Sequence, residues 1–180
     1  MARAPNHVAE VERFLDALDE KSIALIDLVS SIKADVAHSS FANYKRFAEA
    51  GGDFESFCIL IEYRLKRLSA GPDRQALEAR FQAARVGHMA RQLKTSIDLI
   101  GLVATSRELP LGAKDVFLRE LRSIYGLKNT LSEPAYSVGM PAETLRDIEL
   151  AEKILREIIE RAPTLLELSM GLESEPAAPE

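Results

Sequence analysis

DRQALEARFQAARVGHMARQLKTSIDLIGLVAT, residues 73–105, is the stretch that decides the fold. Its apolar residues recur at spacings of three and four, which predicts one long helix. Two apolar stripes run along this helix. Because a helix that is apolar on two sides is usually covered on both, we expect it at the centre of a helical bundle. The first stripe comprises Val86, Met89, Leu93, Ile97, Ile100 and Ala104, and the second includes Leu77, Phe81, Ala84, Leu99 and Leu102.

The residues before this stretch predict three further helices. Residues 7–36 carry a heptad-like apolar seam, which predicts another long helix. A shorter helix with Phe41 and Phe47 on one side is expected to end at Gly51-Gly52, because glycine commonly follows the end of a helix. A separate helix is then expected over residues 54–70.

The residues after it predict two more helices. One begins near Ala113, a loop covers residues 132–141, and a long helix begins near Pro141 and is followed by a short helical turn. Residues 173–180, "ESEPAAPE", are expected to be a disordered acidic tail. No period-two alternation indicates strands. The sequence therefore predicts an all-α, up-and-down bundle of five to six helices, with residues 1–172 as a single helical domain.

Composition bounds the class of protein. The chain has 180 residues, 47% of them hydrophobic, and a net charge of −5, so it lacks the overall basic balance of many nucleic-acid-binding proteins. The single cysteine, Cys58, excludes a disulfide within the chain, and no CxxC metal motif is present. The N-terminal segment has no apolar core of a secretory signal, and no apolar run is long enough to span a bilayer. We expect a cytoplasmic protein without a membrane partner.

One segment departs from the acidic average. Residues 61–94 hold eight basic and three acidic side chains, a local excess of five positive charges. Such a surface suits an acidic partner protein or an RNA backbone, and binding of RNA through it should weaken with salt. A solvated helix face is the alternative interpretation. The residues predicted to bind a partner or nucleic acid are Arg64, Lys66, Arg67, Arg74, Arg80, Arg85 and Arg91.

His88, in "RVGHMARQLK", is a candidate for histidine phosphotransfer. That chemistry needs an exposed imidazole and a nearby cation, which Arg91 would supply. Gln92, however, stands one turn on, where a small residue is needed for access. The alternative is a polar residue in a helix seam, hydrogen-bonded to Gln92 or Thr95.

No metal site and no cofactor are predicted. The acidic residues of the last helix include Glu149 and Glu152, but none is followed three positions later by a histidine, as di-iron bundles require. Intrahelical ion pairs such as Glu152–Arg156 account for them. The sequence also has no glycine-rich phosphate loop and no nucleophile elbow.

"IYGLKNTLSEPAY", residues 124–136, brings a lysine, an asparagine and a glutamate to one predicted helix end. With the helices on either side, residues 113–161, it resembles the C-terminal half of a HEPN domain. The pattern of that family is Arg-Asn-x-x-x-His after an aromatic and an apolar residue. Lys128 falls on the arginine, Asn129 on the asparagine and Glu133 on the histidine, so only Asn129 matches.

The resemblance implies an all-α bundle that forms a homodimer. In HEPN ribonucleases, which need no metal, the histidine moves a proton and the arginine holds the phosphate. A glutamate, with a usual pKa of about 4.3, is charged at neutral pH and repels phosphate, and lysine lacks the bidentate fork of arginine. Lys128, Asn129 and Glu133 therefore suggest a degenerate, inactive site. We expect a non-catalytic HEPN-like regulatory or interaction module that binds a protein or RNA partner.

Two alternatives remain open for this stretch. Burial at a dimer interface would raise the pKa of Glu133 and restore an acid–base group, which makes the chain a metal-independent endoribonuclease. Or the stretch is an ordinary helix exit, in which Asn129 and Ser132 turn the chain and Lys128 interacts with the helix dipole.

Overall fold

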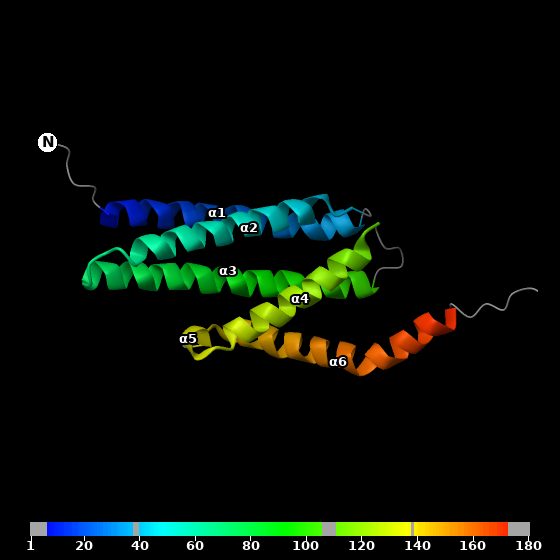
Figure 1. Cartoon of the computed structure of the whole chain (residues 1–180). Helices are drawn as coiled ribbons and strands as arrows, with labels where there is room; N and C mark the ends of the chain where they lie inside the picture. The colour runs from blue at the N-terminus through cyan, green and yellow to red at the C-terminus, as the bar shows by residue number, and fades with distance from the viewer. Residues whose placement is uncertain (1–6, 38–39, 106–110, 138, 173–180) are drawn as a thin grey trace, which may run out of the picture.

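The computed structural model describes residues 7–37, 40–105, 111–137 and 139–172, and within these ranges the side chains of residues 33, 36–37 and 162–172 are left aside. The described residues form six helices and no strand. Consecutive long helices run in alternating directions, as Figure 1 shows, which confirms the predicted all-α, up-and-down bundle. The helices are α1 (His7–Ala37), α2 (Ala42–Leu65), α3 (Pro72–Thr105), α4 (Ala113–Leu131), α5 (Pro134–Ser137) and α6 (Ala142–Leu172).

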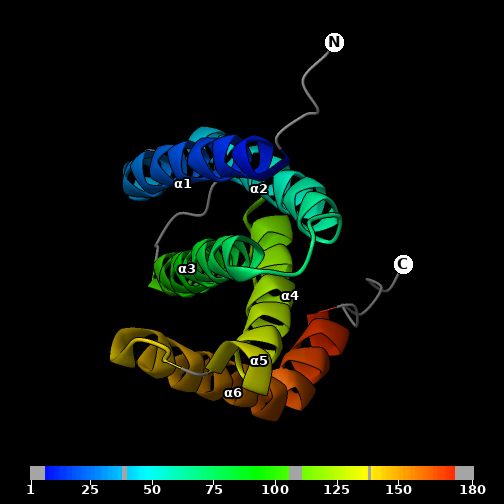
Figure 2. The ribbon, with the colours of Figure 1, turned by 90° about the vertical axis from the view of Figure 1, so that its left-hand side faces the viewer.

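Helix α3 lies at the centre, as its two apolar stripes predict. Figure 2 looks nearly along α3 and shows α1 and α2 on one side of it, α6 on the other, and α4 crossing between the two sides. The stripe that contains Leu77, Phe81 and Leu99 packs into one hydrophobic cluster with α1 and α2. The stripe that contains Met89 and Leu93 packs into a second cluster with α4 and α6. One helix thus supplies a wall to two cores.

The ends of the helices are held by local hydrogen bonds. Asp35, near the end of α1, accepts hydrogen bonds from the backbone N–H of Asn43 at 2.7 Å and from its side-chain amide at 3.0 Å, which ties α1 to the first turn of α2. Gly112 precedes α4 with a φ of 87°, a conformation that costs glycine little and other residues more. The Asp35 hydrogen bonds thus hold the turn between α1 and α2, and Gly112 provides the turn into α4.

The prediction of a helix end at Gly51-Gly52 is wrong. Helix α2 continues through both glycines and ends at Leu65, and neither glycine has a positive φ. The apolar residues explain the difference, because Phe47, Phe54 and Ile61 keep helical spacing across the glycines and are all buried. Packing of that face outweighs the weak helix propensity of two glycines, about 1 kcal/mol each.

Two further boundaries differ from the prediction. Within the expected loop 132–141, residues 134–137 form the short helix α5. The expected short turn near the C-terminus is part of α6, which runs without interruption from Ala142 to Leu172.

The predicted tail, residues 173–180, lies outside the described residues. In the described part of the chain, no helix is both long and apolar enough to cross a membrane.

The continuity of α2 makes a testable prediction. Gly52 is exposed, and a Cβ built on it meets nothing within 4 Å, so Gly52→Ala adds helix propensity without a clash. We expect the free energy of unfolding, measured by urea denaturation, to rise by about 0.5–1 kcal/mol. If α2 instead ended at this glycine in the left-handed conformation, the same substitution would lower stability.

Candidate functional site

The segment that resembles the HEPN motif forms the end of α4 and the turn into α5. The Ser132 hydroxyl donates to the Lys128 carbonyl at 2.7 Å, and the Glu133 N–H donates to the Thr130 carbonyl at 3.1 Å. The Glu133 carbonyl accepts from the N–H groups of Tyr136 and Ser137, at 2.9 and 3.1 Å. The backbone is thus satisfied locally, as in a regular helix exit.

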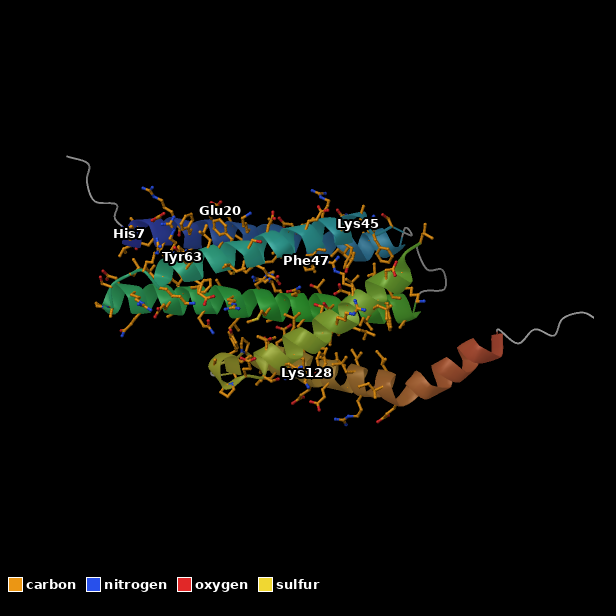
Figure 3. All side chains as sticks on the ribbon, viewed as in Figure 1. His7, Glu20, Lys45, Phe47, Tyr63 and Lys128 are labelled. Atoms are coloured by element: carbon orange, nitrogen blue, oxygen red, sulfur yellow. The ribbon has the colours of Figure 1, made fainter. Side chains whose placement is uncertain are left out.

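The three side chains of this segment are near one another in sequence but do not form a joined cluster. Asn129 and Glu133 are exposed and Lys128 is half-buried, close to α6 at the lower end of α4 in Figure 3. Among the ion pairs of the described residues, none joins Lys128 to Glu133.

The seven basic residues predicted as a binding surface contact their own chain. Four of them pair with carboxylates: Arg64 with Glu10 at 3.3 Å, Lys66 with Glu62 at 2.9 Å, Arg74 with Glu78 at 2.7 Å, and Arg80 with Asp16 and Asp19 at 2.8 and 2.6 Å. Arg67 and Arg85 lie over the rings of Tyr63 and Tyr136, at 4.4 and 5.9 Å from the ring centroids. Arg91 donates a hydrogen bond to the Ser22 hydroxyl. Much of the local positive excess is compensated within the fold.

His88 is buried, with only 4% of its surface exposed. Its imidazole stacks on the Phe54 ring, with 3.9 Å between centroids and 21° between planes. Burial, and secondarily the charge of Arg91, lower the pKa of His88 to about 4, so the ring is neutral at physiological pH. A phosphoryl donor has no direct access to this ring, and the imidazole contributes packing between α2 and α3.

The lowered pKa of His88 makes stability depend on pH. The unfolded chain takes up a proton at this residue near pH 6.5, whereas the native protein resists it down to about pH 4. Stability is therefore complete above pH 6.5 and falls as the pH drops towards 4, by roughly 2–3 kcal/mol from this group. His88→Leu removes that contribution. The unfolding free energy of the natural protein minus that of the variant should therefore decrease as the pH falls from 7 to 4. An unchanged value contradicts the assignment.

A groove along α3 was not predicted from the sequence. Two cavities of about 320 and 520 Å³ adjoin, since Ala90 and Thr144 line both. Small side chains of α3 form the floor, among them Ala79 and Ala83. One wall comes from Ile26 and neighbouring residues of α1, and the other from α5, α6 and the loop between them. Ile26 is 44% exposed, so apolar surface is open to solvent here.

A buried polar cluster joins α2, α3 and α4 and was also missed. Glu120 is only 6% exposed. Its carboxylate accepts a hydrogen bond from the Tyr44 phenol on one oxygen and from the Ser96 hydroxyl on the other, both at 2.5 Å. The Ser96 hydroxyl also lies 3.3 Å from the Ser123 hydroxyl. Burial, followed by the hydrogen bond and charge of Glu120, raises the pKa of Tyr44 well above its ordinary value.

The sequence does carry a signal for this cluster. Glu120 lies between Val116 and Ile124 at four-residue spacing, so a charged residue occupies the buried stripe of α4. A carboxylate in such a position requires partners. Those partners, Tyr44 and Ser96, are 76 and 24 residues away, and no local pattern points to them.

The Tyr44–Glu120 hydrogen bond should contribute measurably to stability. Tyr44→Phe removes one donor to a buried carboxylate while keeping the ring, and hydrogen bonds to charged groups contribute about 1.5–3 kcal/mol. We expect a loss of that size in urea denaturation. Tyr63→Phe, at a tyrosine that is 51% exposed, is the matched control and should change stability little. Equal effects of the two substitutions would contradict the role of the hydrogen bond.

Comparison with known proteins adds no relative. No family model, curated protein or solved structure matches the chain. The functional argument therefore rests on the geometry of its own residues. Among the described residues, no group of three or more histidine, cysteine, aspartate or glutamate side chains is placed to hold a metal ion.

Proposed function

We propose that the chain is a non-catalytic, HEPN-like interaction module that receives an amphipathic helix of a partner protein in the groove along α3. The observation that carries the proposal is the groove itself, two adjoining cavities bounded by three parts of the bundle. Monomeric proteins rarely leave extended apolar concavities open, and such surfaces commonly bind partners. The resemblance of residues 113–161 to HEPN domains is consistent with this class.

The dimensions of the groove favour a helix as its occupant. Its floor runs along α3 from Ala79 to Thr95, a rise of sixteen residue steps, which corresponds to about 24 Å at 1.5 Å per residue. Ala79, Ala83 and Ala90 lack bulk, so the backbone of a docked helix can come close. Apolar side chains at helical spacing on the partner would then meet Val86, Met140 and Ile26.

Charge supports a protein partner over RNA. Two basic residues, Arg91 and Lys94, line one end of the groove together with two acidic ones, Glu143 and Asp147. Arg91 donates a hydrogen bond to Ser22, and Lys94 forms an ion pair with Asp98 at 3.1 Å. A phosphate backbone needs basic groups that are free to replace its counterions. Four of the seven basic residues singled out from the sequence already pair with carboxylates of the chain.

The non-catalytic part of the proposal rests on the end of α4. Lys128 carries charge but not the bidentate geometry of arginine, and Glu133 is exposed and carries no imidazole. His88, which could exchange protons, is buried against Phe54 and belongs to a different part of the bundle.

The module is also proposed to form homodimers, since α6 leaves Leu145, Leu150 and Ile159 exposed. Sedimentation of the natural protein tests this, and a monomer at every concentration would contradict it.

Binding of helical peptides tests the groove. A displayed library of amphipathic helical peptides of about sixteen residues should yield binders. Ala83→Arg places a long charged side chain on the groove floor and should weaken their binding at least tenfold. Ala76→Arg, on an exposed part of α3 outside the groove, is the matched control and should bind as the natural protein does. Equal binding by Ala83→Arg, or the absence of any helical binder, would contradict the proposal.

RNA cleavage tests the absence of catalysis. We expect the natural protein to be inactive on single-stranded RNA and the double substitution Lys128→Arg, Glu133→His to gain activity, because it restores a phosphate-binding fork and a neutral-range proton carrier. Cleavage by the natural protein, lost in Glu133→Ala, would show instead that the chain is a ribonuclease. If neither protein cuts, the resemblance to HEPN enzymes loses its support, while the groove is tested separately.

A further inference from the structure

The polar cluster around Glu120 borders a cavity that lies away from the groove. This cavity, about 180 Å³, is formed where α2, α3 and α4 meet. Tyr44, Gly51 and Glu120 form its buried part, and Gly52, Glu55 and Arg119 are exposed at its mouth. Phe47, labelled in Figure 3, contributes an apolar wall from α2.

The glycines of α2 keep this cavity open. Gly51 is buried, yet a Cβ built on it meets no atom within 4 Å, so its missing side chain faces empty space and not a packed neighbour. A helix-interior glycine costs about 1 kcal/mol relative to alanine. Gly51 lines the same cavity as the buried carboxylate of Glu120, and any larger residue at position 51 would extend into the cavity.

The lining has unused capacity to accept hydrogen bonds. Each oxygen of the Glu120 carboxylate has one donor, Tyr44 or Ser96, and a carboxylate oxygen can accept two. The side-chain carbonyl oxygen of Gln92, which also lines the cavity, is buried without a hydrogen-bond partner. Leaving such a group unmet costs about 1–3 kcal/mol, which a bound donor would recover.

The balance of charge points to a cation. Two carboxylates, Glu55 and Glu120, and one guanidinium, Arg119, line the cavity, which leaves one negative charge in excess. Arg119 lies 5.8 Å from the centroid of the Tyr44 ring and is exposed, so it does not fill the buried end. A small cation with several N–H donors would neutralise the excess and satisfy both Gln92 and Glu120.

We propose that this cavity binds a small organic cation bearing N–H donors, of the ammonium, amidinium or guanidinium class, with Glu120 and Gln92 as its acceptors. The size agrees, since a cavity of roughly 150 Å³ suffices for a molecule as large as benzene. A peptide segment is too large for it. The site is separate from the groove along α3, so it concerns a second ligand and not the partner helix.

Titration with methylguanidinium chloride, followed by amide shifts in two-dimensional NMR, tests the proposal. We expect saturable shifts at Gly51, Gly52 and Ser123, and at least tenfold weaker binding of neutral methylurea. Glu120→Gln keeps the shape and an acceptor for Tyr44 but removes the charge, and should weaken binding at least tenfold. Glu49→Gln, the same change at an exposed residue of α2 outside the cavity, should have no effect.

A second pair of variants guards against a loss of folding. Gly51→Ala fills part of the cavity while raising helix propensity, so it should weaken methylguanidinium binding without lowering stability. Gly101→Ala, at an exposed glycine of α3, should leave binding unchanged. The proposal is overturned if neither methylguanidinium nor methylammonium gives saturable shifts, if Glu120→Gln binds as the natural protein does, or if methylurea binds equally well.

Discussion

The structure depends on the burial of α3 on two sides. A helix of 34 residues with apolar stripes on two faces cannot be satisfied by one neighbouring layer. The α1–α2 pair covers one stripe and α4 with α6 covers the other, so two hydrophobic clusters form on opposite sides of one helix. The other helices pack against these two faces of α3. The groove and the polar cavity lie where these helices leave α3 uncovered.

The two proposed sites differ in chemistry because different side chains of α3 are left uncovered. Alanines at positions 79, 83 and 90 present a shallow apolar floor, which suits the backbone of another helix. On another side of α3, Gln92 lines a small polar cavity together with Glu120 of α4, and Ser96 donates a hydrogen bond to Glu120. A polar cluster of this kind also fixes how α2, α3 and α4 pack, since its hydrogen bonds are lost in any shifted arrangement.

Sequence periodicity was sufficient for the elements that have one continuous apolar pattern. The extents of α1 and α3 agree with the prediction within a residue or two, and both stripes of α3 pack as expected apart from Ala104, which is exposed. The prediction failed at Gly51-Gly52, where the local stop signal of glycine was outweighed by tertiary packing of Phe47, Phe54 and Ile61. It also missed α5, a helix too short to show any period.

The sites were harder to predict than the fold. The residues around Lys128 are close in sequence, so a motif could be compared. Among the described residues, no ion pair joins the side chains of Lys128 and Glu133. Tyr44, Ser96 and Glu120 are distant in sequence and meet only through packing. Basic residues such as Arg80 looked available for a partner because the acids that pair with it, Asp16 and Asp19, belong to another helix. Periodic patterns in a single sequence do not indicate which residues distant in sequence will form hydrogen bonds or ion pairs with one another.

Hydrogen exchange of the native protein tests the central position of α3 most directly. Amides that can open only by global unfolding exchange most slowly. The two-sided burial of α3 predicts the slowest exchange in the described chain for its amides between Met89 and Ile100, with faster exchange along α6. If α3 exchanged as rapidly as α6, it would not be the common wall of two cores, and the arrangement of both proposed sites would have to be abandoned.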